Sequence, residues 1–154
     1  MSTVTQICDA LITRLKTLPG VDQSSRDVYL PAIESQYISL IIPPLGQQTQ
    51  VWTQTARRTP LFQSHRIRCE FWVKLDSGDI PGTLQRAREI GLLAIRSLLD
   101  EPTLGGVVQN VGHFGPGSNQ MSIECDVAET PVVAAKVPYL VATVIVPLTD
   151  YADA

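Results

Sequence analysis

The sequence predicts an α+β fold, in which a mostly antiparallel sheet has two amphipathic helices packed on one face. The main observation is His65–Leu75, which alternates apolar and polar side chains with the period of a half-buried strand. Two other segments, Val4–Leu18 and Pro81–Leu99, repeat apolar residues at the helical period. Several shorter strand-like segments follow the second helix. We therefore expect one sheet with one dry side, which the helices cover.

The composition is that of one domain, spanning residues 1–154. Only 18% of the residues are charged, so the surface must be rich in Gln, Ser and Thr, as surfaces that meet other proteins often are. The net charge of -3 argues against a nucleic-acid backbone as the main partner. The N-terminus lacks a signal-peptide pattern, and the most apolar stretch, Tyr139–Val146, is too short to span a bilayer. We expect a soluble protein with no membrane partner.

The first helix should begin after Ser2 or Thr3, either of which can cap it, and end at Pro19 and Gly20. After a polar link, a short strand is expected at Tyr37–Ile42, because Pro43 and Pro44 then interrupt backbone pairing.

A long loop is expected at residues 45–61, where the sequence is rich in Gln and Thr and has no helical period. A loop of this length inside a compact domain is either functional or disordered. The segment is thus either a plain surface loop or an arm that projects from the sheet and becomes ordered against a partner. Its bulky residues are Val51 and Trp52, and its charges are Arg57 and Arg58.

Two large apolar residues interrupt polar faces. Trp72 stands among the charged residues of the His65–Leu75 strand, and Leu93 falls opposite the apolar stripe of the second helix. Exposed apolar groups of this size can anchor an interface, although another part of the same chain can equally well cover them. With Trp52, Arg57 and Arg58, they form the predicted partner interface.

The remaining chain predicts three strands. They are Val107–Val111, an alternating strand that starts at Met121, and the apolar strand Tyr139–Leu148, which should lie centrally in the sheet. Cys8, Cys69 and Cys125 each fall on an apolar face, so we expect free, buried thiols and a cytoplasmic protein.

No pattern of catalysis or cofactor binding is present in the sequence. His65 and His113 are isolated, no cysteine or histidine has the spacing of a zinc site, and no glycine-rich phosphate loop or nucleophile elbow occurs. The turn at Asp76–Asp79 has too few oxygen ligands for a cation. We therefore expect no metal, no cofactor and no enzymatic activity.

Most of the chain resembles the tail terminator and neck proteins, which join head and tail in long-tailed bacteriophages. The resemblance rests on the N-terminal helix, the strand His65–Val73, the helix end Leu98–Asp100 and the following Thr103–Gly106 turn. It implies a structural protein of the virion, assembled in the host cytoplasm, which caps the finished tail tube as a homo-oligomeric ring, a hexamer, and stops tube polymerisation.

The implied partners are the protein itself, the tail tube protein and the head-tail connector. Arg57 and Arg58 would face either acidic groups of the neighbouring ring or DNA that passes through the channel, and we favour the protein contact. An alternative is another neck component, such as a head completion protein or an adaptor on the portal side. A small cytoplasmic α+β enzyme or ligand-binding module is a further alternative.

Overall fold

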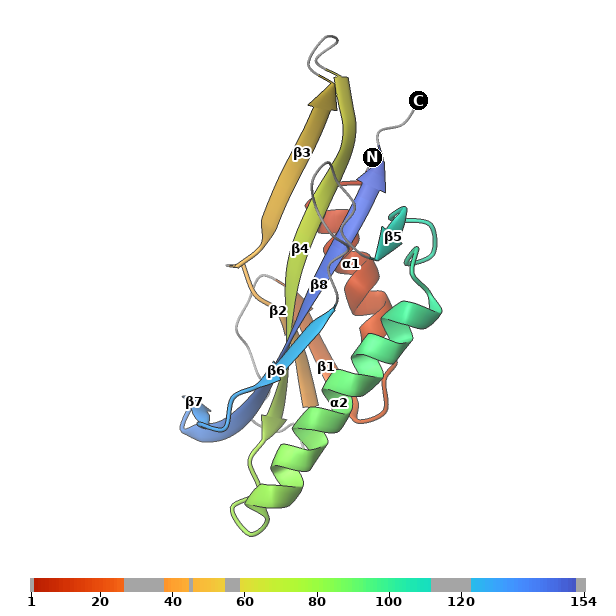
Figure 1. Cartoon of the computed structure of the whole chain (residues 1–154). Helices are drawn as coiled ribbons and strands as arrows, with labels where there is room; N and C mark the ends of the chain where they lie inside the picture. Colours follow the sequence, from red (N-terminus) through yellow and green to blue (C-terminus); the bar gives the residue numbers. More distant parts are fainter. Residues whose placement is uncertain (1, 27–37, 45, 55–58, 112–122, 152–154) are drawn as a thin grey trace.

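The computed structural model describes residues 2–26, 38–44, 46–54, 59–111 and 123–151. Within these ranges, the chain forms two helices and eight strands, and the strands join in one mixed, mostly antiparallel sheet (Figure 1). The helices are α1 (Val4–Leu15) and α2 (Ile80–Asp100), and both pack on the same apolar side of the sheet. The predicted fold class is confirmed.

The sheet is built around two long strands, β4 (Thr59–Lys74) and β8 (Val137–Tyr151), which pair antiparallel from Phe62 opposite Tyr151 to Lys74 opposite Tyr139. Two strands pair with the other side of β4, and three short strands pair with the other side of β8. They are β2 (Ile38–Ile42) and β3 (Gln48–Gln54) beside β4, and β5 (Asn110–Val111), β6 (Glu124–Val127) and β7 (Val132–Ala134) beside β8. The edge strand β1 (Val21–Arg26) pairs parallel with β2.

The expected alternation along β4 places its apolar residues in the core. Ile67, Cys69, Phe71 and Val73 are buried and pack with buried residues of both helices, whereas Arg66 and Arg68 lie on the opposite side of the sheet. The strand β8 contributes every second residue to the same core, from Leu140 to Leu148. Its central position was predicted correctly.

The start of α1 is fixed by its own cap and by the sheet. Thr3 accepts a hydrogen bond from the Gln6 backbone at 3.2 Å, and the Gln6 side chain accepts one from the Thr3 backbone at 2.8 Å. The preceding Ser2 backbone donates to the Asp150 carboxylate of β8 and accepts from Gln63 of β4 at 2.6 Å. These contacts join the N-terminus of the helix to the two central strands.

Three strands differ from the sequence prediction. The expected polar link after α1 contains β1, and the expected structureless loop at residues 45–61 contains β3 and the first residues of β4. Residues 132–134 form β7, which was not predicted. All three are edge strands, which need hydrogen bonds to one neighbour but no strict apolar alternation, so the pattern of their side chains does not reveal them.

The packing of α2 on the sheet depends on a residue without a side chain. Gly91 lies against the thiol of Cys125 in β6, and a Cβ added at Gly91 would overlap the Cys125 Sγ. The same Cβ would lie 3.6 Å from the Cys125 Cβ, which is an ordinary contact distance. The sulfur atom alone therefore prevents a larger residue at position 91.

We expect Gly91→Ala to destabilise the protein by about 1–3 kcal/mol, the usual cost of overpacking a well-filled core. The double variant Gly91→Ala/Cys125→Ala should recover most of that loss, because it removes the overlapping sulfur. Chemical denaturation of the four proteins of this cycle measures the coupling. Additive effects of the two substitutions would contradict the contact.

Candidate interaction surface

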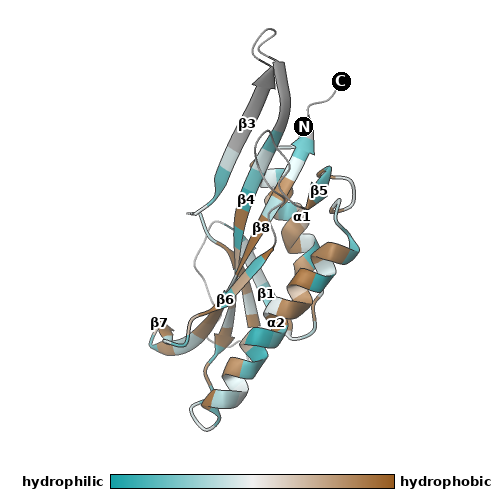
Figure 2. Cartoon of the chain, in the orientation of Figure 1, coloured by the Kyte–Doolittle hydropathy of each residue, from teal (hydrophilic) through white to brown (hydrophobic). Residues whose placement is uncertain are grey.

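The side of the sheet opposite the helices is here called the open face, and on β4 it carries Arg66, Arg68, Glu70, Trp72 and Lys74. The alternation of hydrophilic and hydrophobic residues along β4 can be followed in Figure 2. The exposure of these side chains decreases from the ends of the row to its centre, where Glu70 and Trp72 are buried. Only part of this row is thus accessible to a partner.

The expected exposure of Trp72, on which its role as an interface anchor depended, is contradicted, because the residue is only 7% exposed. It packs with Ile41 of β2 and with Tyr139 and Val141 of β8 in a second, smaller apolar cluster. The Trp72 and Tyr139 rings meet edge to face, with centroids 5.6 Å apart. Neighbouring strands of the same chain supply this cover, which the sequence of β4 alone could not indicate.

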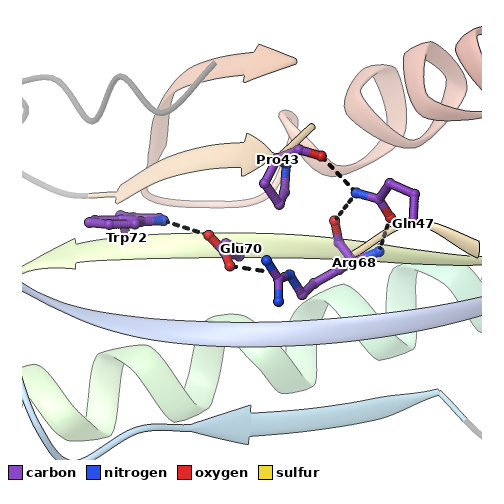
Figure 3. Close-up of polar contacts among 5 residues, drawn as sticks. All are labelled: Pro43, Gln47, Arg68, Glu70 and Trp72. Atoms are coloured by element: carbon purple, nitrogen blue, oxygen red, sulfur yellow. Dashed lines mark hydrogen bonds and ion pairs between the residues drawn. The ribbon is translucent and has the colours of Figure 1, made fainter. Parts of the chain in front are cut away.

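A polar row continues from the indole along β4 (Figure 3). Trp72 Nε1 donates to Glu70 Oε1 at 3.2 Å, and Arg68 Nε lies 3.4 Å from Glu70 Oε2. The buried carboxylate of Glu70 therefore has a hydrogen-bond donor on one oxygen and a cationic partner beside the other, so its charge is compensated. The row holds Arg68 along the strand, next to the chain segment that connects β2 with β3.

The side chain of Gln47 fills a gap in the sheet. Along one side of β4, β2 pairs as far as Glu70 and β3 begins to pair at Arg66, so the Arg68 backbone between them has no strand opposite. The Gln47 amide takes that place: its Oε1 accepts from the Arg68 backbone N–H at 2.7 Å, and its Nε2 donates to the Arg68 carbonyl at 3.2 Å (Figure 3). A second bond from Nε2 to the Pro43 carbonyl, at 2.9 Å, fixes the amide.

Sequence reasoning did not find Gln47, because a glutamine after two prolines and a glycine is typical of any polar turn. Its role depends on a backbone position, Arg68, that is distant in sequence. The turn at Gly46 also brings the chain within 3.1 Å of the Arg68 guanidinium, measured from the place a Cβ would occupy. Gly46 has a φ of 87°, which favours glycine.

We expect Gln47→Ala to destabilise the protein by about 1–3 kcal/mol, because it leaves the Arg68 backbone groups without their partner. Gln47→Glu is the matched control: it keeps the acceptor for the Arg68 N–H but loses the donor to the Arg68 carbonyl. Amide hydrogen exchange distinguishes the two variants. The Arg68 amide should stay protected in Gln47→Glu and lose its protection in Gln47→Ala. Equal, unchanged protection in both variants would contradict the bridge.

The expectation that Leu93 is exposed is also wrong. Leu93 is partly buried against the core and, with Pro19 and Ile38, lines a hollow of about 200 Å³. The exposed leucines of α2 are instead Leu92 and Leu99, at 54% and 63%. The helix α2 turns its small residues toward the sheet. Its buried face is therefore not the face that its large apolar residues indicate.

The other predicted interface residues lie in or next to the β3–β4 hairpin. Trp52 belongs to β3 and stands opposite Phe62 in the register, while Arg57 and Arg58 lie outside the described residues. The expected loop is thus a strand pair over most of its length, and Figure 1 shows it extending past the two helices. The structure brings Trp52 near neither Trp72 nor Leu93, since these lie on the other half of β4 and on α2.

The helical side has an open groove of about 870 Å³ between α1 and the turn after α2. A hydrogen bond from the Thr103 hydroxyl at 2.8 Å, and a second from the Gly105 N–H, hold the pKa of Glu101 below its usual value. Arg14, from α1, donates to the Ser97 hydroxyl at 2.9 Å and to the Ser97 carbonyl at 3.1 Å, and the second bond caps the end of α2. These groups stabilise the local turn and do not converge on a common point of the groove.

The three cysteines form no disulfide, as expected, and Cys8 and Cys69 are buried. Cys125 is only half-buried, unlike the prediction, and burial raises the pKa of the Cys69 and Cys125 thiols. The described part of the chain contains no cluster of His, Cys, Asp and Glu that could hold a metal ion. Neither helix of the described chain has the length and apolar character needed to cross a membrane.

No protein-family model matches this chain, and no curated protein is significantly similar to it.

Proposed function

We propose that the protein is a structural component of a long-tailed phage virion, a tail terminator that assembles as a ring on the end of the tail tube. The feature that carries the proposal is the β3–β4 hairpin, which extends past the helices (Figure 1). The resemblance of the sequence to terminator and neck proteins supports the same function. A ring of identical subunits needs such a repeated contact surface.

The hairpin suits a contact with protein. The strand β3 reads Gln-Thr-Gln-Val-Trp-Thr-Gln, with many hydrogen-bonding groups, two bulky apolar residues and no charge. Binding through such a strand relies on backbone and amide hydrogen bonds, and an aromatic residue can supply a buried anchor. A surface of this composition fits the tail tube protein or the head-tail connector better than it fits a nucleic-acid backbone.

A second candidate is another neck component, such as a head completion protein or an adaptor on the portal side. The same hairpin favours it, because a projecting polar strand serves any ring-to-ring contact. The two functions differ in which structure the protein binds: the tube end for a terminator, and the portal for an adaptor.

We expect the purified protein, or its complex with tube, to give a six-fold mass in native mass spectrometry, because a hexamer is the state that the resemblance implies. The measurement should be repeated at low ionic strength and at high protein concentration to favour weak rings. A mass that stays monomeric alone and with assembled tubes would exclude the ring.

A shortened hairpin tests the contact itself. Residues 53–61 can be replaced by Asn-Gly, because Trp52 and Phe62 stand opposite each other as a hydrogen-bonded pair, and a two-residue turn closes such a pair. We expect the variant to fold and to lose most of its binding to tube ends. In a phage that depends on it, tails should then grow beyond their normal length, as electron microscopy would show.

The control for the shortened hairpin is Ser77→Ala, in the exposed turn before α2, at the opposite end of β4. It should leave tail length unchanged. Tails of normal length with the shortened hairpin would exclude its role in capping, and heads that fail to retain DNA despite normal tails would favour the portal-side candidate.

A further inference from the structure

We infer that neighbouring copies of this chain join through their sheets, with the free edge of β3 in one copy pairing antiparallel with the free edge of β6 in the next. The inference deepens the proposed function, since it names the surface that would close the ring. The partner is a second copy of this chain, and the contact is backbone hydrogen bonding between Thr49 and Val51 of one copy and Val127 and Cys125 of the other.

The backbone directions of β3 follow from the Gln47 bridge. The Arg68 N–H and C=O point toward Gln47, so the Arg66 groups, two residues away, point the same way and meet Gln48. Successive residues of a strand alternate, so Thr49 and Val51 direct their backbone groups away from β4. Within the described residues no strand pairs with that edge.

The same reasoning applies to β6. The Arg68 backbone points away from β8, so its neighbours Ile67 and Cys69 point toward β8 and meet Val146 and Val144. The next pairs outward, Ile145 with Glu124 and Thr143 with Asp126, are therefore the hydrogen-bonded ones. This leaves Cys125 and Val127 with backbone groups directed to the outside, where no strand of the described chain pairs with them.

These two edges fit each other in direction, spacing and face. Because β3 runs antiparallel to β4 and β6 runs parallel to it, a neighbouring sheet in the same orientation presents β6 antiparallel to β3. Thr49 and Val51 are two residues apart, as are Cys125 and Val127. Thr49 lies on the helical side, where it contacts His65, and Cys125 packs on the core from the same side. The joined sheet therefore keeps one face throughout.

The edge of β3 lacks the features that keep edge strands apart. Monomeric proteins protect exposed edges with Lys, Pro or inward charges. The residues from Gln48 to Gln54 contain none of these, and the single register shift lies near the end of the strand, after Trp52. An unprotected edge of this kind is typical of a strand that pairs with another chain.

Pairing at this register also gives the stagger that a ring requires. Val51 lies level with Gln63 of β4, whereas Cys125 lies level with Cys69 through Val144, six residues further along. Six residues correspond to about 20 Å along a strand. Each copy contributes four strands, β3, β4, β8 and β6, which span about 19 Å across the sheet, so the strands would tilt by roughly 45° from the ring axis. Closed barrels have tilts of about 35–45°. In a ring closed with the helices outside, the open face with Arg66 and Arg68 would line the channel.

The first test is Val51→Pro, which removes an outward N–H without removing a bond to β4. It should stay folded by circular dichroism and lose at least tenfold in self-association by analytical ultracentrifugation. Val51→Ala, which keeps the N–H, should associate like the natural chain. Folded Val51→Pro protein that still forms the full assembly would overturn the pairing.

The second test does not depend on how the proline variant folds. Val51→Cys places a thiol opposite the natural Cys125 of the next copy, at a spacing that allows a disulfide. Oxidation should give a ladder of covalent oligomers, and Val51→Cys/Cys125→Ser should give none. Dimers formed by the double variant would show two β3 strands facing each other, and the absence of any ladder in Val51→Cys would equally exclude the β3–β6 contact.

Both tests use the purified protein, so they are separate from capping. If Val51→Cys gives the ladder but the shortened hairpin leaves tail length unaffected, the pairing is supported and the proposed function is excluded. If the shortened hairpin changes tail length but Val51→Pro assembles normally, the proposed function is supported and the pairing is excluded.

Discussion

The backbone of β4 is the constraint on which this structure depends. Its 16 residues carry hydrogen-bonding groups on both sides, and β8 satisfies one side along almost the whole strand. The other side is divided among β2, the Gln47 side chain and β3. The two helices need only one half of this strand pair to bury their apolar faces. The other half of β4 pairs with β3 in the projecting hairpin, which is where a partner has most room to bind.

The core could be predicted from the sequence because periodicity is enough to define it. The residues of β4 from Ile67 to Val73 alternate as buried strand residues must, and Ile7 and Leu11 of α1 recur at the helical period. Each of these positions is determined by its own element. The fold class, both helices and the central position of β8 followed from that local information.

The candidate surface could not be predicted in the same way, because its residues are defined by neighbours that are distant in sequence. Trp72 is covered by Tyr139 and Ile41, which belong to two other strands. Leu93 is partly covered at a hollow lined by Pro19. The hairpin strand β3 is mostly polar and has no continuous apolar face, so only its pairing with β4 identifies it. Side-chain patterns report burial within one element and are silent about backbone pairing at an edge.

The amide of Gln47 separates two kinds of sequence requirement along a single strand. On the C-terminal side of Arg68, β4 packs between the helices and a second apolar cluster, so most substitutions there alter the core. On the N-terminal side of Arg68, β4 is paired with β3 by backbone hydrogen bonds, which almost any residue other than proline can make. Residues of β3 can thus change to match a new partner at little cost to folding. A lineage of such proteins would be expected to diversify fastest in this segment, and a hairpin transplanted between two members at Gln47 would carry its binding preference with it.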